Sequence, residues 1–258
     1  MLQKIKSKLR RTFRPPALAG LADLVTIDHR VSTVTLGSRY GSWTIPEPAI
    51  SEGSRCYLFG AGEDISFDVA LIRRFGVEAH VFDPTPRAKT HVEGLIEATR
   101  AGRPFSVNND PGISYEIETA DLEKLHFHGI GIWSKAERLR FYAPANPEHV
   151  SHSAVNLQRT ASFFEAEVQP LDQIMRDLGH DLPDLVKLDV EGAEYQALGA
   201  MLDANLLPAL LLVEFDEGNQ PLDDGATARI QNQIEALRQA GYGILDLSGW
   251  NACFFRLP

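Results

Sequence analysis

The sequence of 258 residues has few cysteines and no long apolar run. Its two cysteines, Cys56 and Cys253, each lie in an apolar segment typical of a buried strand. Two isolated cysteines provide neither a disulfide framework nor a zinc site, so we expect buried thiols in a reducing, cytoplasmic compartment. No apolar run approaches the roughly 18–20 residues that a membrane-spanning helix needs.

Positive charge is also scarce, because 25 lysines and arginines face 35 aspartates and glutamates and leave a formal net charge of −10. Binding to a phosphate backbone requires a basic surface, so the composition argues against nucleic acid as the main partner. The hydrophobic fraction of 44% is ordinary for a globular protein with a sizeable core. The length suits one large domain.

The start of the chain, MLQKIKSKLRRTFRPP, departs from this acidic average because it carries six basic residues and no acid. Its apolar residues fall at helical spacing, which is compatible with a short basic amphipathic helix. No apolar signal-peptide region follows, so we do not expect a secretory leader. One interpretation is weak contact of residues 1–14 with an anionic membrane surface, and the alternative is a solvated or packed arm.

From Arg55 onward, strand patterns alternate with helix patterns. The predicted strands are CYLFG, VEAHVF, FHGIGIW, PDLVKLDV and PALLLVEF, with extra strands at RLRFYAP and FEAEVQP. We expect helices after Asp64 as N-cap, from Pro86 to about Thr99, at LDQIMRDLG, at GAEYQALGAML, and around Ile234. GYGILDLS and NACFFRLP form a closing antiparallel pair.

This alternation predicts an α/β fold with a doubly wound, seven-stranded, mostly parallel sheet and a C-terminal antiparallel hairpin. We divide the chain into a basic arm and irregular extension over residues 1–54 and one domain over residues 55–258. The extension contains strand-like pieces such as RVSTVTL but gives no clear pattern.

The stretch CYLFGAGEDISFD places a glycine turn at the carboxyl end of a strand, where doubly wound sheets bind ligands. Gly60 and Gly62 would let ligand atoms approach the backbone. Asp83 ends the next strand, where an acid can accept hydrogen bonds from ribose hydroxyls. Together these features suggest a ligand that contains adenosine, although the glycines alone are compatible with an ordinary tight turn.

Two details distinguish the possible ligands. A dinucleotide fingerprint has a third glycine where this sequence has Ile65. Glu63 and Asp64 follow the turn, and their negative charges would oppose a pyrophosphate. S-adenosylmethionine has no phosphate and carries sulfonium and ammonium cations, so it tolerates nearby acids. An NAD-type oxidoreductase is the disfavoured alternative.

The segment LVKLDVEGAEYQAL, residues 185–198, resembles the signature of the FkbM family of methyltransferases. The upstream FGAGEDISFD, HVFDPTP and GIGIW and the downstream LLLVEFDEG match the order of elements in that family, over roughly residues 55–220. The resemblance implies a Rossmann-like class I methyltransferase fold, S-adenosyl-L-methionine as cofactor, and O-methylation of a hydroxyl on a sugar or other small metabolite.

The resemblance also assigns site residues. The residues expected to bind the cofactor are Phe59, Gly60, Ala61, Gly62, Glu63, Asp64, Asp83, Pro84, Gly131, Ile132 and Asp189. One departure is Leu58, which stands where many relatives have an acid that helps hold the amino-acid end of the cofactor. Glu63 is a possible substitute, and the departure leaves open a non-catalytic domain that keeps the fold.

Methyl transfer to a hydroxyl is helped by a general base. Asp189, Glu191 and His152 are the catalytic candidates, and Glu214 and Asp216 are further acids at a strand end. Asp189 and Glu191 lie two residues apart, so an extended chain would direct both to one side. Alternatively, Lys187 pairs with one of these carboxylates and Glu194 caps a helix. The acids could bind a divalent metal, but no ligand spacing requires one. The acceptor, a small molecule or glycan, is not identified by the residues.

Overall fold

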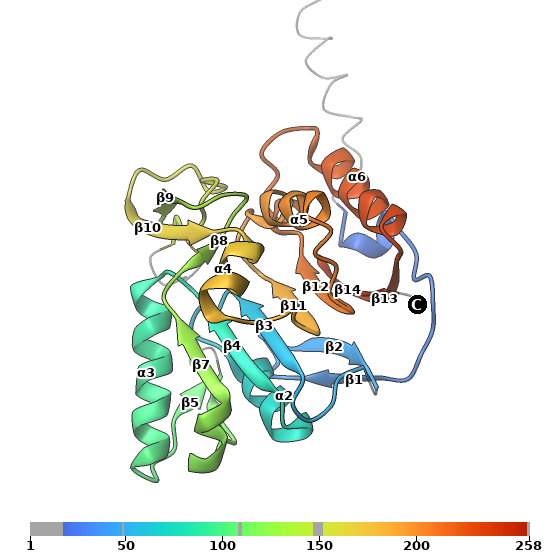
Figure 1. The fold of residues 1–258 in the computed structure, drawn as a ribbon. Helices are drawn as coiled ribbons and strands as arrows, with labels where there is room; N and C mark the ends of the chain where they lie inside the picture. Colours follow the sequence, from blue (N-terminus) through green and yellow to red (C-terminus); the bar gives the residue numbers. More distant parts are fainter. Residues whose placement is uncertain (1–17, 48, 108–109, 147–151, 257–258) are drawn as a thin grey trace, which may run out of the picture.

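A seven-stranded sheet forms the centre of the computed structural model (Figure 1), which describes residues 18–47, 49–107, 110–146 and 152–256. The order is β13-β14-β12-β11-β3-β4-β7. From one edge to the other these strands are Tyr242–Ser248, Asn251–Arg256, Leu210–Glu214, Leu185–Leu188, Arg55–Phe59, Glu78–Phe82 and Leu125–His128. Within this sheet β14 runs antiparallel to both of its neighbours, and the other six strands run parallel to one another. The predicted sheet and its C-terminal antiparallel hairpin are confirmed.

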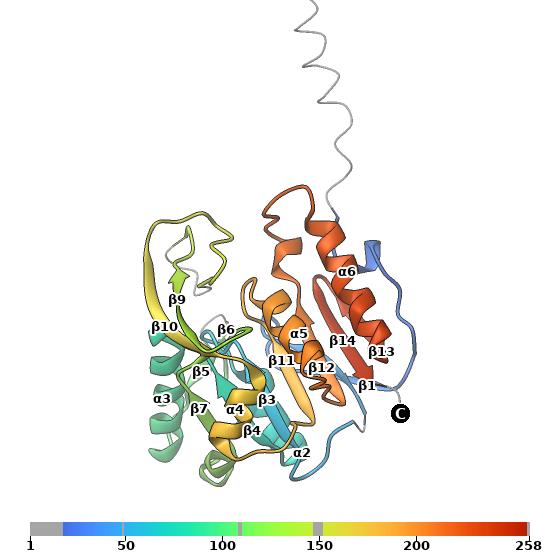
Figure 2. The same cartoon turned by 45° about the horizontal axis from the view of Figure 1, so that its top comes forward.

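Helices cover both faces of the sheet, as Figures 1 and 2 show from two directions. One face packs against α4 (Leu171–Leu178), α5 (Glu194–Asp203) and α6 (Ala226–Gln239). The other packs against α2 (Ser66–Phe75), α3 (Pro86–Arg100) and the hairpin of β1 (Thr33–Leu36) and β2 (Trp43–Pro46). Three short 3₁₀ helices complete the helical segments of the described ranges: η1 (Leu21–Asp23), η2 (Thr119–Lys124) and η3 (Asp216–Gly218).

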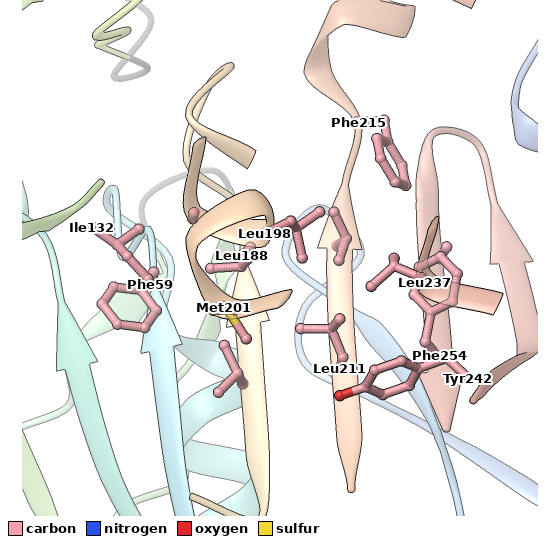
Figure 3. Close-up of a cluster of buried hydrophobic side chains, with 14 of the residues drawn as sticks. Phe59, Ile132, Leu188, Leu198, Met201, Leu211, Phe215, Leu237, Tyr242 and Phe254 are labelled. Atoms are coloured by element: carbon pink, nitrogen blue, oxygen red, sulfur yellow. The ribbon is translucent and has the colours of Figure 1, made fainter. Parts of the chain in front are cut away.

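The apolar runs of the sequence become the two faces of the central strands. Phe59, Leu188 and Leu211 are at most 1% exposed and belong to one buried cluster with Leu198 of α5 and Leu237 of α6 (Figure 3). Burial of each such side chain contributes on the order of 1.5–3 kcal/mol. Strands covered on both faces need few polar positions, which explains runs such as PALLLVEF.

A small three-stranded sheet, with order β8-β10-β9, lies apart from the central sheet near the carboxyl ends of its strands (Figure 1). Its strands are Gly131–Ile132 (β8), Glu137–Tyr142 (β9) and Phe163–Gln169 (β10). The prediction of one strand over FHGIGIW was wrong, because β7 ends at His128. Ile130 N donates a hydrogen bond to His128 O at 2.9 Å, and this tight turn sends the chain into the small sheet. A further hairpin pairs β5 (Ser106–Val107) with β6 (Asp110–Ser114).

Helix α2 begins at Ser66, so the prediction of Asp64 as its N-cap was wrong by one residue. Asp64 Oδ1 accepts a hydrogen bond from Ser66 N at 2.9 Å, within the turn that leads into the helix. Cys56 and Cys253 are buried free thiols, as predicted. Residues 1–14, for which weak membrane-surface contact was one of two interpretations, lie outside the described residues. Within the described ranges, no helix combines the length and apolar character needed to cross a membrane.

Candidate cofactor-binding and catalytic site

A pocket of about 360 Å³ lies at the carboxyl ends of β3, β4, β11 and β12, where the helices on the two faces diverge. This volume is within the range of small-molecule sites. The pocket brings together every site residue predicted from the sequence: Phe59, Gly60, Ala61, Gly62, Glu63, Asp64, Asp83, Pro84, Gly131, Ile132, His152, Asp189 and Glu191.

Sequence reasoning missed other parts of the wall. The β1–β2 hairpin contributes Tyr40, Gly41 and Trp43 to the pocket wall. Its position there depends on tertiary packing, which no local sequence pattern predicts. Asp68 is a different case, because a signal was available. It lies four residues before Ile72 and so interrupts the apolar face of ISFDVALI. Phe141 joins from β9.

The turn after β3 depends on Gly60 for a steric reason. Its φ is +89°, in the region that favours glycine, and an added Cβ would lie 1.7 Å from the carbonyl oxygen of Asp189. Gly60 N also donates a hydrogen bond to Phe82 O at 2.9 Å. The glycine therefore permits close packing of three strand ends, in addition to any approach of ligand atoms.

Asp83 organises this turn. Its Oδ2 accepts hydrogen bonds from Ala61 N at 3.0 Å and Gly62 N at 2.9 Å, and its Oδ1 accepts one from Thr85 N at 2.8 Å. Burial raises the pKa of Asp83 above its ordinary value, against the opposing effect of these donors. Binding of ribose hydroxyls by Asp83 stays a prediction, and it would use the lone pairs that remain on its two oxygens.

The two acids after the turn are engaged with other residues. Glu63 forms a salt bridge with Arg87 of α3 at 2.8 Å, and Asp64 accepts hydrogen bonds from the Ser38 hydroxyl and Ser66 N. Because Arg87 counters its charge, Glu63 contributes less to the electrostatic argument against a phosphate than we expected. Arg87 was not anticipated from the sequence, since one basic residue at the start of a helix gives no specific signal.

Lys187 and Asp189 connect β11 to the turn. The Lys187 ammonium donates a hydrogen bond to Gly60 O at 2.9 Å and lies 3.0 Å from Asp189 Oδ2. The structural pairing that we considered for Lys187 is therefore present. Glu191 has φ of +54°, so the extended geometry predicted for residues 189–191 was wrong. Asp189 and Glu191 nevertheless both line the pocket, because the chain turns at Glu191.

Further acids lie beside this pair. Burial, with repulsion from Asp189 and Glu191, raises the pKa of Glu214 well above its ordinary value, so Glu214 resists ionisation when no cation is nearby. Asp216 and Glu194 are also buried, and burial, with repulsion from Glu191, raises the pKa of both. Glu194 accepts a hydrogen bond from Gly192 N at 2.9 Å. Glu194 lies in the first turn of α5, as the capping alternative expected, but α5 has no side-chain hydrogen bond at its N-cap.

His152 reaches the pocket from the connection between β9 and β10. Its ring packs edge-on against Phe164 of β10, with ring centroids 5.2 Å apart. The small sheet therefore brings His152 to the wall that also includes Phe141. His152, a catalytic candidate from the sequence, therefore lines the same pocket as Asp189 and Glu191.

Comparison with known proteins identifies the family. The model of the FkbM methyltransferase domain matches residues 59–243, which is more than half of the chain and includes the glycine turn and the acids after β11. The chain belongs to the FkbM methyltransferase family. This FkbM methyltransferase is S-adenosylmethionine-dependent, as its family implies.

Several solved structures resemble the FkbM methyltransferase at low identity. An rRNA methylase from Streptococcus thermophilus is 9% identical, with a TM-score of 0.41, and the match covers 81% of this chain and 90% of that one. The C-terminal domain of precorrin-6Y C5,15-methyltransferase from Rhodobacter capsulatus is 10% identical, with a TM-score of 0.38 and coverages of 80% and 81%.

A third solved structure, a mutant of MtNAS, is 12% identical with a TM-score of 0.36. The match covers 81% of the FkbM methyltransferase, which spans only 55% of the MtNAS chain. The comparison with curated proteins gave no match.

The residues of the pocket fit S-adenosylmethionine. Its sulfonium and ammonium groups are cations, and carboxylates from β4, β11, β12 and α2 line the pocket. Phe59, Phe82 and Ile132 add apolar surface for the uncharged part of the ligand. Among the described residues, no group of three or more histidine, cysteine or acidic side chains is arranged to hold a metal ion.

Proposed function

We propose that this FkbM methyltransferase transfers a methyl group to a hydroxyl oxygen of a sugar or another small-molecule or glycan acceptor. The observation that carries the proposal is the meeting of Asp189 and Glu191 with His152 in one pocket. These three side chains come from the end of β11 and from the small sheet, so they flank the space that an acceptor would enter. Each can accept a proton from a hydroxyl.

Methyl transfer demands little covalent chemistry from the protein. Bound S-adenosylmethionine supplies a methyl group on a cationic sulfur, which departs as a neutral thioether. The acceptor oxygen forms the new bond to carbon as the carbon–sulfur bond breaks and its electron pair goes to sulfur. The hydroxyl proton passes to Asp189, Glu191 or His152. The side chains around the pocket align the two substrates and exclude water.

Glu214 is less suited to the role of base. Its raised pKa favours the protonated form, which can donate a hydrogen bond to an acceptor oxygen. Asp189 is instead held beside Lys187, which stabilises its carboxylate. We therefore assign proton acceptance to Asp189 or Glu191 with His152 and assign a binding role to Glu214.

The experiment uses S-adenosylmethionine labelled with ¹³C in its methyl group and a panel of hydroxyl acceptors, including monosaccharides and glycans. The proposal predicts a product whose NMR chemical shift identifies an O-methyl group. Asp189→Asn should lower turnover roughly 10²–10⁴-fold, the usual contribution of a general base. A product methylated on nitrogen or carbon would contradict the proposal.

Two alternatives are distinguished by related measurements. The family match argues against an NAD-type oxidoreductase. A non-catalytic domain would bind S-adenosylhomocysteine but methylate no acceptor of the panel, so cofactor binding and product formation are measured on the same preparation.

A further inference from the structure

Leu58 lies on β3 two residues before Gly60, and it provides no negative charge at this position. Leu58 of β3 pairs in register with Lys187 of β11, and residues paired in this way direct their side chains to the same face of a sheet. Leu58 is fully buried and packs with Val69 and Leu71 of α2. An acid at position 58 would therefore lie beside the Lys187 ammonium, on the side of the sheet that α2 covers.

Asp68 supplies a negative charge in this place from another element. It lies in the first turn of α2, is only 2% exposed and lines the pocket. Burial alone lowers the pKa of Lys187, but Asp189 and Asp68 more than offset this effect, so the pKa of Lys187 lies above its ordinary value. A carboxylate of the helix thus acts on Lys187 where the strand itself carries none.

The negative charge of Asp68 is only partly balanced by the Lys187 ammonium. The Lys187 ammonium already makes its close contacts with Asp189 and Gly60 O. Within the described part of the chain, the donor to Asp68 is its own backbone N–H, and no side chain donates to it. Burying a carboxylate is costly, and burial, only partly offset by the Lys187 ammonium, raises the pKa of Asp68 to about 6. A cationic group of a ligand would remove this cost.

We propose that Asp68 takes the place of the acid absent at position 58 and binds the α-ammonium group of S-adenosylmethionine. Asp83 and Asp68 lie on opposite sides of the glycine turn, the first at the end of β4 and the second beside β11 and Lys187. A cofactor whose adenosine lies near Asp83 would therefore extend across the end of β3 and place its amino-acid end near Asp68. This inference rests on S-adenosylmethionine being the cofactor.

Two ligands separate this role from a purely structural one. S-adenosylhomocysteine carries the α-ammonium group, whereas 5′-methylthioadenosine has the same adenosine and sulfur but lacks the amino-acid end. Asp68→Asn keeps the size of the side chain and removes its charge. It should weaken S-adenosylhomocysteine binding roughly 10- to 100-fold, as expected for a charged hydrogen bond, and change the affinity for methylthioadenosine less than about threefold.

Binding of methylthioadenosine also reports that the variant pocket is folded. Equal losses for both ligands would overturn the proposal, because they would assign Asp68 to the support of the turn. Unchanged affinity for both would also overturn it. The double variant Leu58→Asp with Asp68→Asn returns the acid to β3 and should recover part of the selectivity for S-adenosylhomocysteine. If the wild-type protein bound neither ligand, the cofactor assignment would fail and this inference with it.

Discussion

Gly60 is the residue on which the steric integrity of the site depends most strongly. We predict that Gly60→Ala abolishes cofactor binding and lowers the free energy of unfolding by more than the roughly 1–3 kcal/mol of backbone strain, since its Cβ would overlap the Asp189 carbonyl. Urea denaturation and calorimetry measure both effects. Gly53→Ala is the matched control, because Gly53 has a similar φ of +81° but no atom within 4 Å of an added Cβ. Equal destabilisation by both variants would show that the overlap is unimportant.

Asp83 tests whether a predicted ligand residue also holds the protein together. We expect Asp83→Asn to lower the free energy of unfolding by about 1–3 kcal/mol without any cofactor, because an amide NH₂ cannot accept the hydrogen bonds from the turn. Urea denaturation of the cofactor-free protein provides the measurement. Stability equal to that of the wild type would mean that Asp83 serves the ligand alone.

For single residues, the sequence predicted which side chains line the pocket more successfully than it predicted the partners that they contact. Glycines and acids at strand ends carry a recognisable signal, and all of those predicted except Asp216 line the pocket. Their partners could not be predicted in the same way. The bond from Ala61 N to Asp83 and the salt bridge from Glu63 to Arg87 each join residues more than 20 positions apart, and no local pattern specifies such a pairing.

At the scale of elements, the contact between the β1–β2 hairpin and the glycine turn was not predicted from the sequence. The hydroxyl of Ser38 in its loop donates a hydrogen bond to Asp64 and accepts bonds from Tyr40 N and Gly41 N. The backbone N–H of Ser38 donates to Ser66 Oγ at 2.6 Å. These contacts hold the loop over the glycine turn. The hairpin therefore couples the N-terminal extension to the cofactor pocket.

We predict that Ser38→Ala loosens this loop and weakens S-adenosylhomocysteine binding several-fold, since the hydroxyl satisfies three partners at once. Calorimetry and limited proteolysis within residues 37–42 measure the two effects. Thr35→Val is the control within the same hairpin, because Thr35 bonds to Thr44 on the exposed side. If the two variants had the same affinity for the ligand, the loop would have no part in the site.

The other elements show where pattern analysis succeeds. Helix α3 begins at Pro86, as predicted, and α6 buries Ile230, Ile234 and Leu237 on one face. FHGIGIW was misassigned because its apolar alternation continues through Gly129 and Ile130, where the chain actually turns. A glycine within a strand-like run was the available warning.

For the molecule as a whole, a group of stacked histidines links stability to pH. The ring centroids of His80 and His126 are 4.6 Å apart, and Nδ1 of His80 is 3.0 Å from His128 Nε2. Burial, with repulsion from neighbouring histidines, lowers the pKa of His80 to about 3 and that of His128 to about 4. The unfolded chain therefore binds protons more readily, and the stability due to these rings is lost as the pH falls below about 6.5.

We predict that His80→Phe reduces the acid sensitivity of folding. Between about pH 7.5 and pH 5, protonation linked to His80 should cost the wild type about 2 kcal/mol, and the variant should lack this contribution. Urea denaturation at both pH values measures it. Tyr57→Phe removes the hydroxyl bonded to His180 in the same group but no titrating ring, so it should change stability similarly at both pH values. An unaltered pH dependence in His80→Phe would contradict the prediction.

The overall architecture could be predicted because it depends on repeated local signals: buried strands, amphipathic helices and a closing hairpin. The N-terminal extension could not, since Leu21, Trp43 and Ile45 are buried only by packing against distant segments. The same packing places Tyr40 and Trp43 in the pocket. Fold and cofactor class thus follow from the sequence, whereas the part of the pocket wall that the hairpin supplies depends on tertiary structure.

Calorimetric titration of the wild-type protein with S-adenosylhomocysteine, with a parallel titration of NAD, tests the central claim most directly. The pocket between the glycine turn and the acids after β11 should bind S-adenosylhomocysteine at one site per chain and give no heat with NAD. Binding of NAD without binding of S-adenosylhomocysteine would contradict the account.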